Sequence, residues 1–259
     1  MFINKLPSLS NVVAGSTATL DCPVGLTYDA IQFQYSGVTQ AQIENVEVLI
    51  NGRPVAQFDD AVEVEAINEY YGRSDASGEM TLHFRRPELL EGQRAFPGLG
   101  TADVDTLQIR MDINVAASAP VISASAQLSP GAPLGVFVKT RYLALNVSAA
   151  GKQELDSIPK GSGRLLAAHL FKADISEVEV EVNSRRVMEG TKDLMESLQT
   201  LAGRTPQTAA ATHVDFGLYG DLGEALVLSG VRDFRIRPTA DTTGTLRVVL
   251  EYLDGFEGV

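Results

Sequence analysis

The sequence predicts an all-β protein of two tandem eight-stranded jelly-roll barrels side by side, a double jelly roll with a short helix inserted in each barrel. Residues 43–55 recur as residues 175–187 without a gap, which indicates one structural unit used twice. Many short runs alternate apolar and polar residues, as half-buried strands do. Glycine and proline separate these runs, and short strands joined by such turns are typical of sandwiches and closed barrels.

The repeated stretch reads IENVEVLINGRPV in the first copy and ISEVEVEVNSRRV in the second. Both copies alternate and then reach Asn51-Gly52 or Asn183-Ser184, so each predicts a strand that runs into a tight turn. A shift of one residue would move the apolar side chains to the other face, so this strand fixes the register of its partners. Further matches follow in the same order: 20–21 with 155–156, 72–73 with 203–204, 82–84 with 214–216, and 104–110 with 231–237.

A chain of 259 residues suits two domains, each long enough to bury a core. We expect the first jelly roll at 1–128, a linker at 129–135, where proline and glycine are densest, and the second jelly roll at 136–259. Residues 1–7 lack the layout of a signal peptide, and no apolar run approaches the ~18 residues of a membrane-spanning helix. The protein is therefore expected to be made in the cytoplasm of its host.

The first half predicts strands over 12–21, 30–35, 43–50, 80–84, 106–113 and 120–128. Residues 59–71 are ambiguous, because 62–65 alternate like a strand whereas the apolar residues also share one helical stripe that ends at Gly72. The second copy favours the helix, since 191–202 has leucines at helical spacing with Thr191 as its cap. We therefore expect helices over 60–71 and 191–202.

The second half predicts strands over 136–147, 152–156, 165–171, 175–182, 212–219, 225–228, 231–237 and 245–253. Each helix is expected after the fourth strand of its unit. Residues 136–147 have no clear counterpart in the first half, so they either lead into the second unit or bridge the two. Residues 85–105 form a long loop that is either functional or packed against a neighbour. Residues 254–259 are expected to be a short exposed tail.

Charge and cysteine content exclude several classes of function. The net charge of −12 opposes direct binding to nucleic acid, which depends on Lys and Arg neutralising phosphate. It also opposes adhesion to an anionic membrane surface, and it favours solubility at high copy number. Cys22 is the only cysteine, so the chain has no disulfide framework, and this residue is expected to be a small apolar core residue.

No residue set predicts a catalytic, cofactor-binding or metal site. The three histidines share no local motif and are expected at edges or on the surface: His83, His169 and His213. No calcium-loop, phosphate-loop or nucleophile motif occurs. Strand glutamates such as Glu47 and Glu179 are expected to point to one solvated face. The pairs Arg85-Arg86 and Arg185-Arg186 are expected to be rim or inter-subunit charges.

Five short stretches carry a family resemblance: NVVAG at 11–15, PVGLTY at 23–28, YSGVT at 35–39, RPE at 86–88 and VLEY at 249–252. Together they resemble the major capsid protein of corticoviruses, which are tailless marine bacteriophages with a lipid membrane beneath the shell. The similarity is strongest over 1–60 and continues in patches to the end. It departs from the family pattern at the loops 92–102 and 205–211.

The resemblance implies a homotrimer of double jelly rolls whose six barrels approximate a hexagon and tile an icosahedral shell over an internal membrane. It implies neighbouring trimers, a vertex (penton) protein and the membrane as partners, and no catalytic residues. It implies that no cofactor is required; a structural Ca²⁺ ion is a candidate without named ligands, and Phe2 and Ile3 are a candidate anchor on the inner face. The repeat supports this arrangement, because two similar barrels per chain let a trimer present six near-equivalent edges.

Two other classes of function stay open. A tandem jelly-roll carbohydrate-binding protein would need exposed aromatic side chains on a sheet or in a cleft, and the chain has no tryptophan. A jelly-roll enzyme would need clustered histidines or two carboxylates in a cleft, and the sequence places neither. We therefore expect a structural capsid protein in the virion rather than an enzyme.

Overall fold

The computed structural model describes residues 1–91, 94–207 and 209–258. The first half contains β1 (Phe2–Lys5), β2 (Thr17–Cys22), β3 (Thr27–Ser36), η1 (Gln40–Gln42), β4 (Ile43–Ile50), β5 (Arg53–Asp60), α1 (Ala61–Tyr70), β6 (Glu79–His83), β7 (Arg86–Glu91), β8 (Arg94–Phe96), β9 (Leu99–Gly100), β10 (Leu107–Ile113) and β11 (Val121–Ser129). The second half contains β12 (Val136–Val147), β13 (Gly151–Lys152), β14 (Arg164–Phe171), β15 (Ile175–Val182), β16 (Arg185–Thr191), α2 (Lys192–Leu201), β17 (Thr212–Asp215), η2 (Leu222–Glu224), β18 (Leu226–Val227), β19 (Phe234–Ala240) and β20 (Gly244–Gly255).

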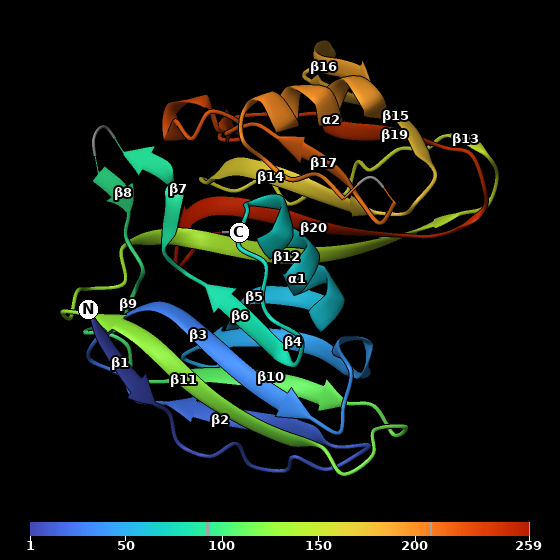
Figure 1. Ribbon diagram of the computed structural model, residues 1–259. Helices are drawn as coiled ribbons and strands as arrows, with labels where there is room; N and C mark the ends of the chain where they lie inside the picture. Colours follow the sequence, from blue (N-terminus) through green and yellow to red (C-terminus); the bar gives the residue numbers. More distant parts are fainter. Residues whose placement is uncertain (92–93, 208, 259) are drawn as a thin grey trace.

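Each half folds as a jelly roll of two antiparallel sheets packed face to face. The sheets of the first half have the strand orders β1-β11-β3-β6 and β2-β10-β4-β5. Those of the second half have the orders β12-β20-β14-β17 and β13-β19-β15-β16. Matched in chain order, the two halves have the same topology, with eight main strands each. The expected double jelly roll is therefore confirmed, and Figure 1 shows the two units stacked one above the other.

Each jelly roll has its own hydrophobic core, formed by the inward residues of alternating strands. In the repeated strand β4, Val46, Val48 and Ile50 face the first core, and in β15 Val178 and Val180 face the second. Cys22 lies in the first core, as expected, and burial raises the pKa of its thiol to about 12. The period of two thus explains why valines of the repeated strand face the core in both units.

The turn after the repeated strand explains why asparagine occurs in both copies. Asn51 and Asn183 adopt left-handed backbone conformations, with φ of 51° and 49°, which asparagine tolerates better than most residues. The side-chain oxygen of Asn51 accepts two backbone N–H groups just before β10, at 3.0 and 2.9 Å. That of Asn183 accepts two just before β19, at 2.9 and 3.1 Å. Each asparagine therefore ties its hairpin to the loop that leads into the neighbouring strand.

Both predicted helices are present, which resolves the ambiguity at 59–71 in favour of the helix. Asp60 caps α1 by accepting the N–H of Glu63 at 3.0 Å, and Thr191 caps α2 by accepting that of Leu194 at 3.3 Å. The helices follow the fifth strand of each unit, so their expected place after the fourth is wrong. The edge strand β5 was not predicted, because it contains Pro54 and pairs with β4 through a register shift, and both features disturb its alternation.

The strand β12 both begins the second jelly roll and bridges the two units. It pairs with β20 along its whole length, as the shorter β1 pairs with β11. It also touches the first unit, where the N–H of Gln57 on β5 donates to Thr140 Oγ1 at 2.9 Å. At the other end of the second unit, β20 continues to Gly255 and Asp254 is buried. The expected exposed tail is therefore wrong for these two residues, and also for Phe256, which is partly buried against the first core.

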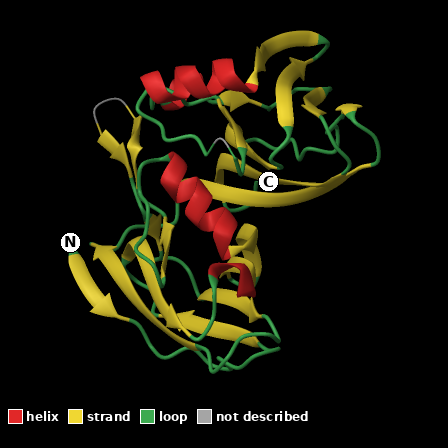
Figure 2. Ribbon diagram, turned by 45° about the vertical axis from the view of Figure 1, so that its right-hand side comes forward, coloured by secondary structure: helices red, strands yellow, loops and turns green. Residues whose placement is uncertain are grey.

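The long loop of the first half packs against the second jelly roll. It carries the short strands β7, β8 and β9, and its Leu89 is buried in a small cluster with Leu166 and Leu222 of the second unit. The part of this loop at 92–93, like residue 208 in the loop 205–211, lies outside the described residues. Figures 1 and 2 show α1 between the two jelly rolls and α2 at the outer side of the second.

Candidate functional site: the contact surfaces

The interface between the two jelly rolls is built on α1. This helix lies across the outer face of the sheet β12-β20-β14-β17, where Ile67, Tyr70 and Tyr71 share a buried cluster with Phe171 and Val249. Alternation places these two partners on the outer face, because their strand neighbours Leu170 and Val248 face the second core. The part of this outer face that carries Phe171 and Val249 is thus apolar, and α1 covers it.

A buried ion pair joins the two units beside this cluster. Arg86 donates to both carboxylate oxygens of Glu251, at 2.7 and 3.2 Å, and Tyr71 donates its hydroxyl to the same carboxylate at 2.6 Å. The guanidinium of Arg86 also lies 4.2 Å from the centre of the Tyr71 ring. Burial by itself would raise the pKa of Glu251, but Arg86 holds that pKa well below its ordinary value.

Arg86 corrects one expectation from the sequence. The pair Arg85-Arg86 was expected at the rim, yet Arg86 is only 3% exposed, whereas the side chain of Arg85 is half-exposed. Arg185 and Arg186 are exposed, as expected. The partner of Arg86 lies 165 residues away on β20, so no local sequence signal could have identified it.

Two histidines form the centre of the same interface. His169 and His213 are both buried, and their Nδ1 atoms lie 2.8 Å apart because the two residues are paired across β14 and β17. Tyr70 stacks on His213 with 4.2 Å between ring centres. Burial lowers the pKa of His213 well below its ordinary value, and His169 adds to this effect. The expectation of an edge or surface position is therefore wrong for His169, which lies on the inner strand β14. His213 does lie on the edge strand β17, but its side chain is buried rather than exposed.

His83 lies on β6, the edge strand of its sheet, and is half-buried. Burial lowers its pKa to about 4, with a smaller effect of the positive charge on Arg73. His83 thus belongs to a sheet of the first jelly roll, whereas His169 and His213 belong to a sheet of the second. The lowered pKa values of His83 and His213 hold these two side chains in the neutral form near pH 7.

A second buried ion pair continues the interface on its other side. Arg204 donates from Nε to Asp215 at 3.1 Å, and Tyr70 donates its hydroxyl to the same oxygen at 3.0 Å. Arg73 pairs with Glu88 at 3.3 Å nearby. Each buried carboxylate in this region therefore faces an arginine, and tyrosines from α1 complete the contacts. Chemically, this arrangement holds two folded units together rather than presenting a reactive group to a substrate.

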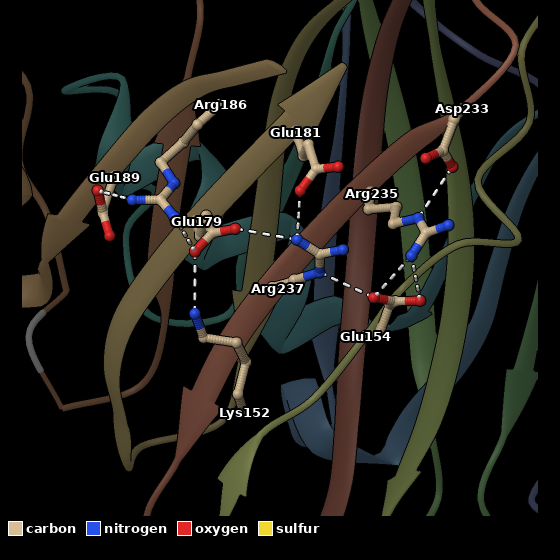
Figure 3. Close-up of polar contacts among 9 residues, drawn as sticks. All are labelled: Lys152, Glu154, Glu179, Glu181, Arg186, Glu189, Asp233, Arg235 and Arg237. Atoms are coloured by element: carbon tan, nitrogen blue, oxygen red, sulfur yellow. Dashed lines mark hydrogen bonds and ion pairs between the residues drawn. The ribbon is translucent and has the colours of Figure 1, made fainter. Parts of the chain in front are cut away.

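The outer face of the other sheet of the second jelly roll, β13-β19-β15-β16, carries a network of surface charges (Figure 3). Arg237 contacts Glu154 at 2.8 Å, Glu179 at 3.0 Å and also Glu181. Lys152 contacts Glu179 at 2.9 Å from the other side. Glu179 does lie on the outer face as expected, but these cations cover it. Because the acidic and basic residues neutralise each other, this face presents no single-sign patch for a charged ligand.

Metal and membrane features are limited. Across residues 1–91, 94–207 and 209–258, no group of three or more histidine, cysteine, aspartate or glutamate side chains is placed to hold a metal ion. The expected Ca²⁺ ion therefore stays a prediction. No helix in the described part of the chain is long and apolar enough to cross a membrane. The candidate anchor residues Phe2 and Ile3 lie on β1, paired with β11, and both are exposed.

Comparison with known proteins identifies the family. The models for the viral coat protein P2 N-terminal domain and C-terminal domain match residues 3–129 and 137–256. Major capsid protein P2 of Pseudoalteromonas phage PM2 is 31% identical over 270 aligned positions, covering 97% of this chain and 96% of that protein. The crystal structure of P2 from bacteriophage PM2 superposes with a TM-score of 0.93 at 26% identity, covering 100% of this chain and 99% of the other.

More distant structures share the fold alone. A chain in the atomic structure of Sulfolobus turreted icosahedral virus has a TM-score of 0.72 at 11% identity, covering 98% of this chain and 91% of the other. The PBCV-1 virus capsid has a TM-score of 0.63 at 9% identity, covering 100% and 95%. The resemblance to the corticovirus capsid protein is thus confirmed, and the carbohydrate-binding alternative gains no support. The chain belongs to the viral coat protein P2 family, and its relative from phage PM2 is a viral major capsid protein.

Proposed function

We propose that this chain is the major capsid protein of a membrane-containing bacteriophage and that it acts as a structural protein in the virion, without catalysis. The observation that supports this most is that the two jelly rolls share one fold, while only one of their two helices is covered by the other jelly roll. Within the chain, α1 of the first jelly roll covers a sheet of the second. The corresponding helix α2 faces outward (Figure 1).

We further propose that three copies form a ring of six jelly rolls with a pseudo-hexagonal outline. The two ends of one chain present different surfaces, so contacts between copies are head-to-tail, and such contacts form closed rings when the rotation per unit allows it. A rotation of about 60° per jelly roll would close six units, or three chains. Such trimers could then tile an icosahedral lattice.

Other partners belong to the same proposal. The resemblance to corticoviruses supports an internal membrane and a vertex (penton) protein as neighbours, synthesis in the cytoplasm of a bacterial host, and a structural Ca²⁺ ion. The exposed apolar residues Phe2 and Ile3 are available for contact with the membrane or another protein. The net charge of −12 supports the absence of direct contact with nucleic acid.

The proposal is tested by measuring the mass of the purified protein with light scattering over a range of concentrations. We expect a species of three 27.7 kDa chains. A chain that stays monomeric at every concentration would contradict the proposal. Negative-stain microscopy of the concentrated protein, with Ca²⁺ or with a chelator, then shows whether the trimers form lattices and whether the ion promotes them. Flotation with neutral and anionic lipid vesicles tests the membrane contact.

A further inference from the structure

The groove between β16 and α2 is the second-half counterpart of the groove that forms the interface inside the chain. The groove between β5 and α1 is lined on its own side by Ala56, Phe58, Val64, Ile67 and Asn68, and β12 and β20 close it from the other unit. The groove between β16 and α2 is lined at the matching positions by Met188, Gly190, Met195, Leu198 and Gln199. All residues that line this second groove belong to the second jelly roll.

Both helices are attached to their own unit in the same way, which establishes the match. Asn68 of α1 donates its side-chain amide to the carbonyl of Thr81 on β6 at 2.8 Å. Gln199 of α2 donates its side-chain amide to the carbonyl of His213 on β17 at 2.6 Å. The caps Asp60 and Thr191 and the glycines that follow each helix occupy matching positions as well. The two helices therefore present the same face away from their cores.

That face is buried in one copy and exposed in the other. On α1 it is 0%, 5% and 0% exposed at three positions: Glu63, Ile67 and Tyr70. On α2 the matching positions are all leucine and are 52%, 45% and 82% exposed: Leu194, Leu198 and Leu201. A row of exposed leucines beside an open groove marks a contact surface.

We infer that this groove receives the β1–β11 edge of the first jelly roll in a second copy of the chain. This inference rests on the proposed function, because it names the surfaces through which the copies assemble. The strands β1 and β11 occupy in the first sheet the places that β12 and β20 occupy in the second. β1 is exposed along its whole length, whereas β12 contacts the first jelly roll. The contact between copies then repeats the contact within the chain.

Strand register identifies which residues meet. On the second sheet, Ala167 is paired with Asp215 on one side and Glu251 on the other. On the first sheet, Ala30 is paired with His83 and Gln127. The sequence repeat matches His83 with Asp215, so Gln127 takes the place of Glu251. Ser123 lies four residues before Gln127 on β11, as Arg247 lies four residues before Glu251 on β20, and neither stretch contains a register shift. Ser123 therefore takes the place of Arg247.

The matched positions carry different chemistry. Inside the chain, Arg247 Nε lies 3.4 Å from Glu63 Oε1. Between copies, the same pair of positions would hold Ser123 and Leu194. No charge would then need to be buried at this point, and leucine would pack on a small side chain of the facing sheet. A contact that forms between separately folded chains thus avoids the desolvation of an ion pair.

The test recreates the internal ion pair between copies. We expect Leu194→Glu to weaken trimer formation by about 100-fold or more, since it places an unpaired carboxylate in the contact. Adding Ser123→Arg to the same chain is expected to restore the trimer, because the two substitutions reproduce Glu63 and Arg247. Val115→Glu is the matched control, since Val115 is 81% exposed on a loop of the first jelly roll. Mass is measured by light scattering, and folding of every variant by circular dichroism.

Each outcome decides between the inference and the proposed function. A trimeric wild type, a monomeric but folded Leu194→Glu variant and a trimeric double variant support the inference. If Leu194→Glu stays trimeric, or if Ser123→Arg does not restore the trimer, the inferred contact is wrong while assembly itself stands. If the wild type is monomeric at every concentration, the proposed assembly fails and the inference fails with it. A short bismaleimide linking Leu194→Cys to Ser123→Cys provides an independent reading, because Cys22 is buried.

Discussion

The two jelly rolls are alike where the backbone requires a particular residue and different where a surface meets a neighbour. Both keep the left-handed asparagine after the repeated strand, the helix cap and the amide that attaches the helix to the next strand. They differ on the outer face of the helix, which is buried in α1 and exposed in α2. The two units therefore share the residues that determine the fold, whereas the residues on the outer face of each helix depend on the surface that covers it.

The contrast extends to charge. The contact inside the chain contains the ion pair between Arg86 and Glu251, whereas the matching positions in the open contact are Leu218 and Gln127. A buried ion pair is costly to desolvate and gives orientation more than stability. It therefore suits an interface that forms once, as the chain folds, and whose two sides never separate.

The largest expected effect comes from breaking this ion pair. Arg86→Ala leaves Glu251 buried without its cation, which destabilises folded proteins by about 3–5 kcal/mol. Arg85→Ala is the control, because the Arg85 side chain is half-exposed and lies 3.9 Å from Asp29, so its removal should change stability by less than about 1 kcal/mol. Urea unfolding measures both. An equal effect of the two substitutions would contradict the importance of the buried pair.

Transplanting the matching residues sharpens the same comparison. The double variant Arg86→Leu with Glu251→Gln gives the internal contact the residues of the open one, and removes both charges together. We expect it to recover most of the stability lost in Arg86→Ala, because replacing a buried ion pair by neutral groups is often close to neutral. If the double variant is less stable than Arg86→Ala, the two contacts are not interchangeable.

The next largest effect tests what the two units share. Asn51→Ala and Asn183→Ala each remove an acceptor of two backbone N–H groups and place alanine in a left-handed conformation. We expect a loss of about 2 kcal/mol in either unit. Asn146→Ala on the exposed side of β12 serves as the control. Clearly unequal losses in the two asparagine variants, measured by urea unfolding, would show that the two hairpins are not equivalent.

A third prediction concerns pH and the groups buried under α1. The folded pKa values of His213 and His83 are lowered, to about 4 for His83, so the unfolded chain takes up these protons first. The contribution of these histidines to the free energy of unfolding is complete above about pH 6.5. It falls as the pH drops, by up to about 1.4 kcal/mol per pH unit for each histidine. Burial raises the pKa of Glu63 to about 7, so its contribution is present at low pH and is lost as the pH rises through that value.

These opposing contributions are separated by substitution. His213→Gln is expected to make the free energy of unfolding fall less steeply as the pH drops. Glu63→Gln is expected to make it fall more steeply, because the Glu63 carboxyl no longer binds a proton in the folded state between about pH 4.3 and about pH 7. Urea unfolding of both variants and the wild type at three pH values in this range measures the slopes. Parallel slopes in all three proteins would show that these groups titrate alike in the folded and unfolded chain.

The smallest expected effect lies in the second residue of the two hairpins. Gly52 and Ser184 both have positive φ, at 76° and 63°, and serine is strained in that region. Ser184→Gly should therefore stabilise the protein by about 0.5–1 kcal/mol, and Gly52→Ser should destabilise it by a similar amount. Thermal unfolding measures both changes, and a Ser184→Gly variant of lower stability would contradict the argument.

The sequence by itself determined the repeat, the strand alternation, the left-handed turns and the helix caps, because steric preferences and hydrogen bonds between near neighbours set these features. The long loop at 85–105 could be predicted to be functional or to pack against a neighbour, and it packs against the second jelly roll. The strand β5 escaped prediction, since Pro54 and a register shift obscure its pattern.

Only the tertiary structure decided which polar residues are buried. His169 and His213 have no shared motif, yet β14 and β17 bring them into contact, and Arg86 meets its carboxylate across 165 residues of sequence. The same holds for α2, whose leucines have helical spacing in the sequence and are exposed in the chain. The physical reason is that a residue's local pattern fixes the face on which it lies, whereas its burial depends on which other folded surface comes to cover that face.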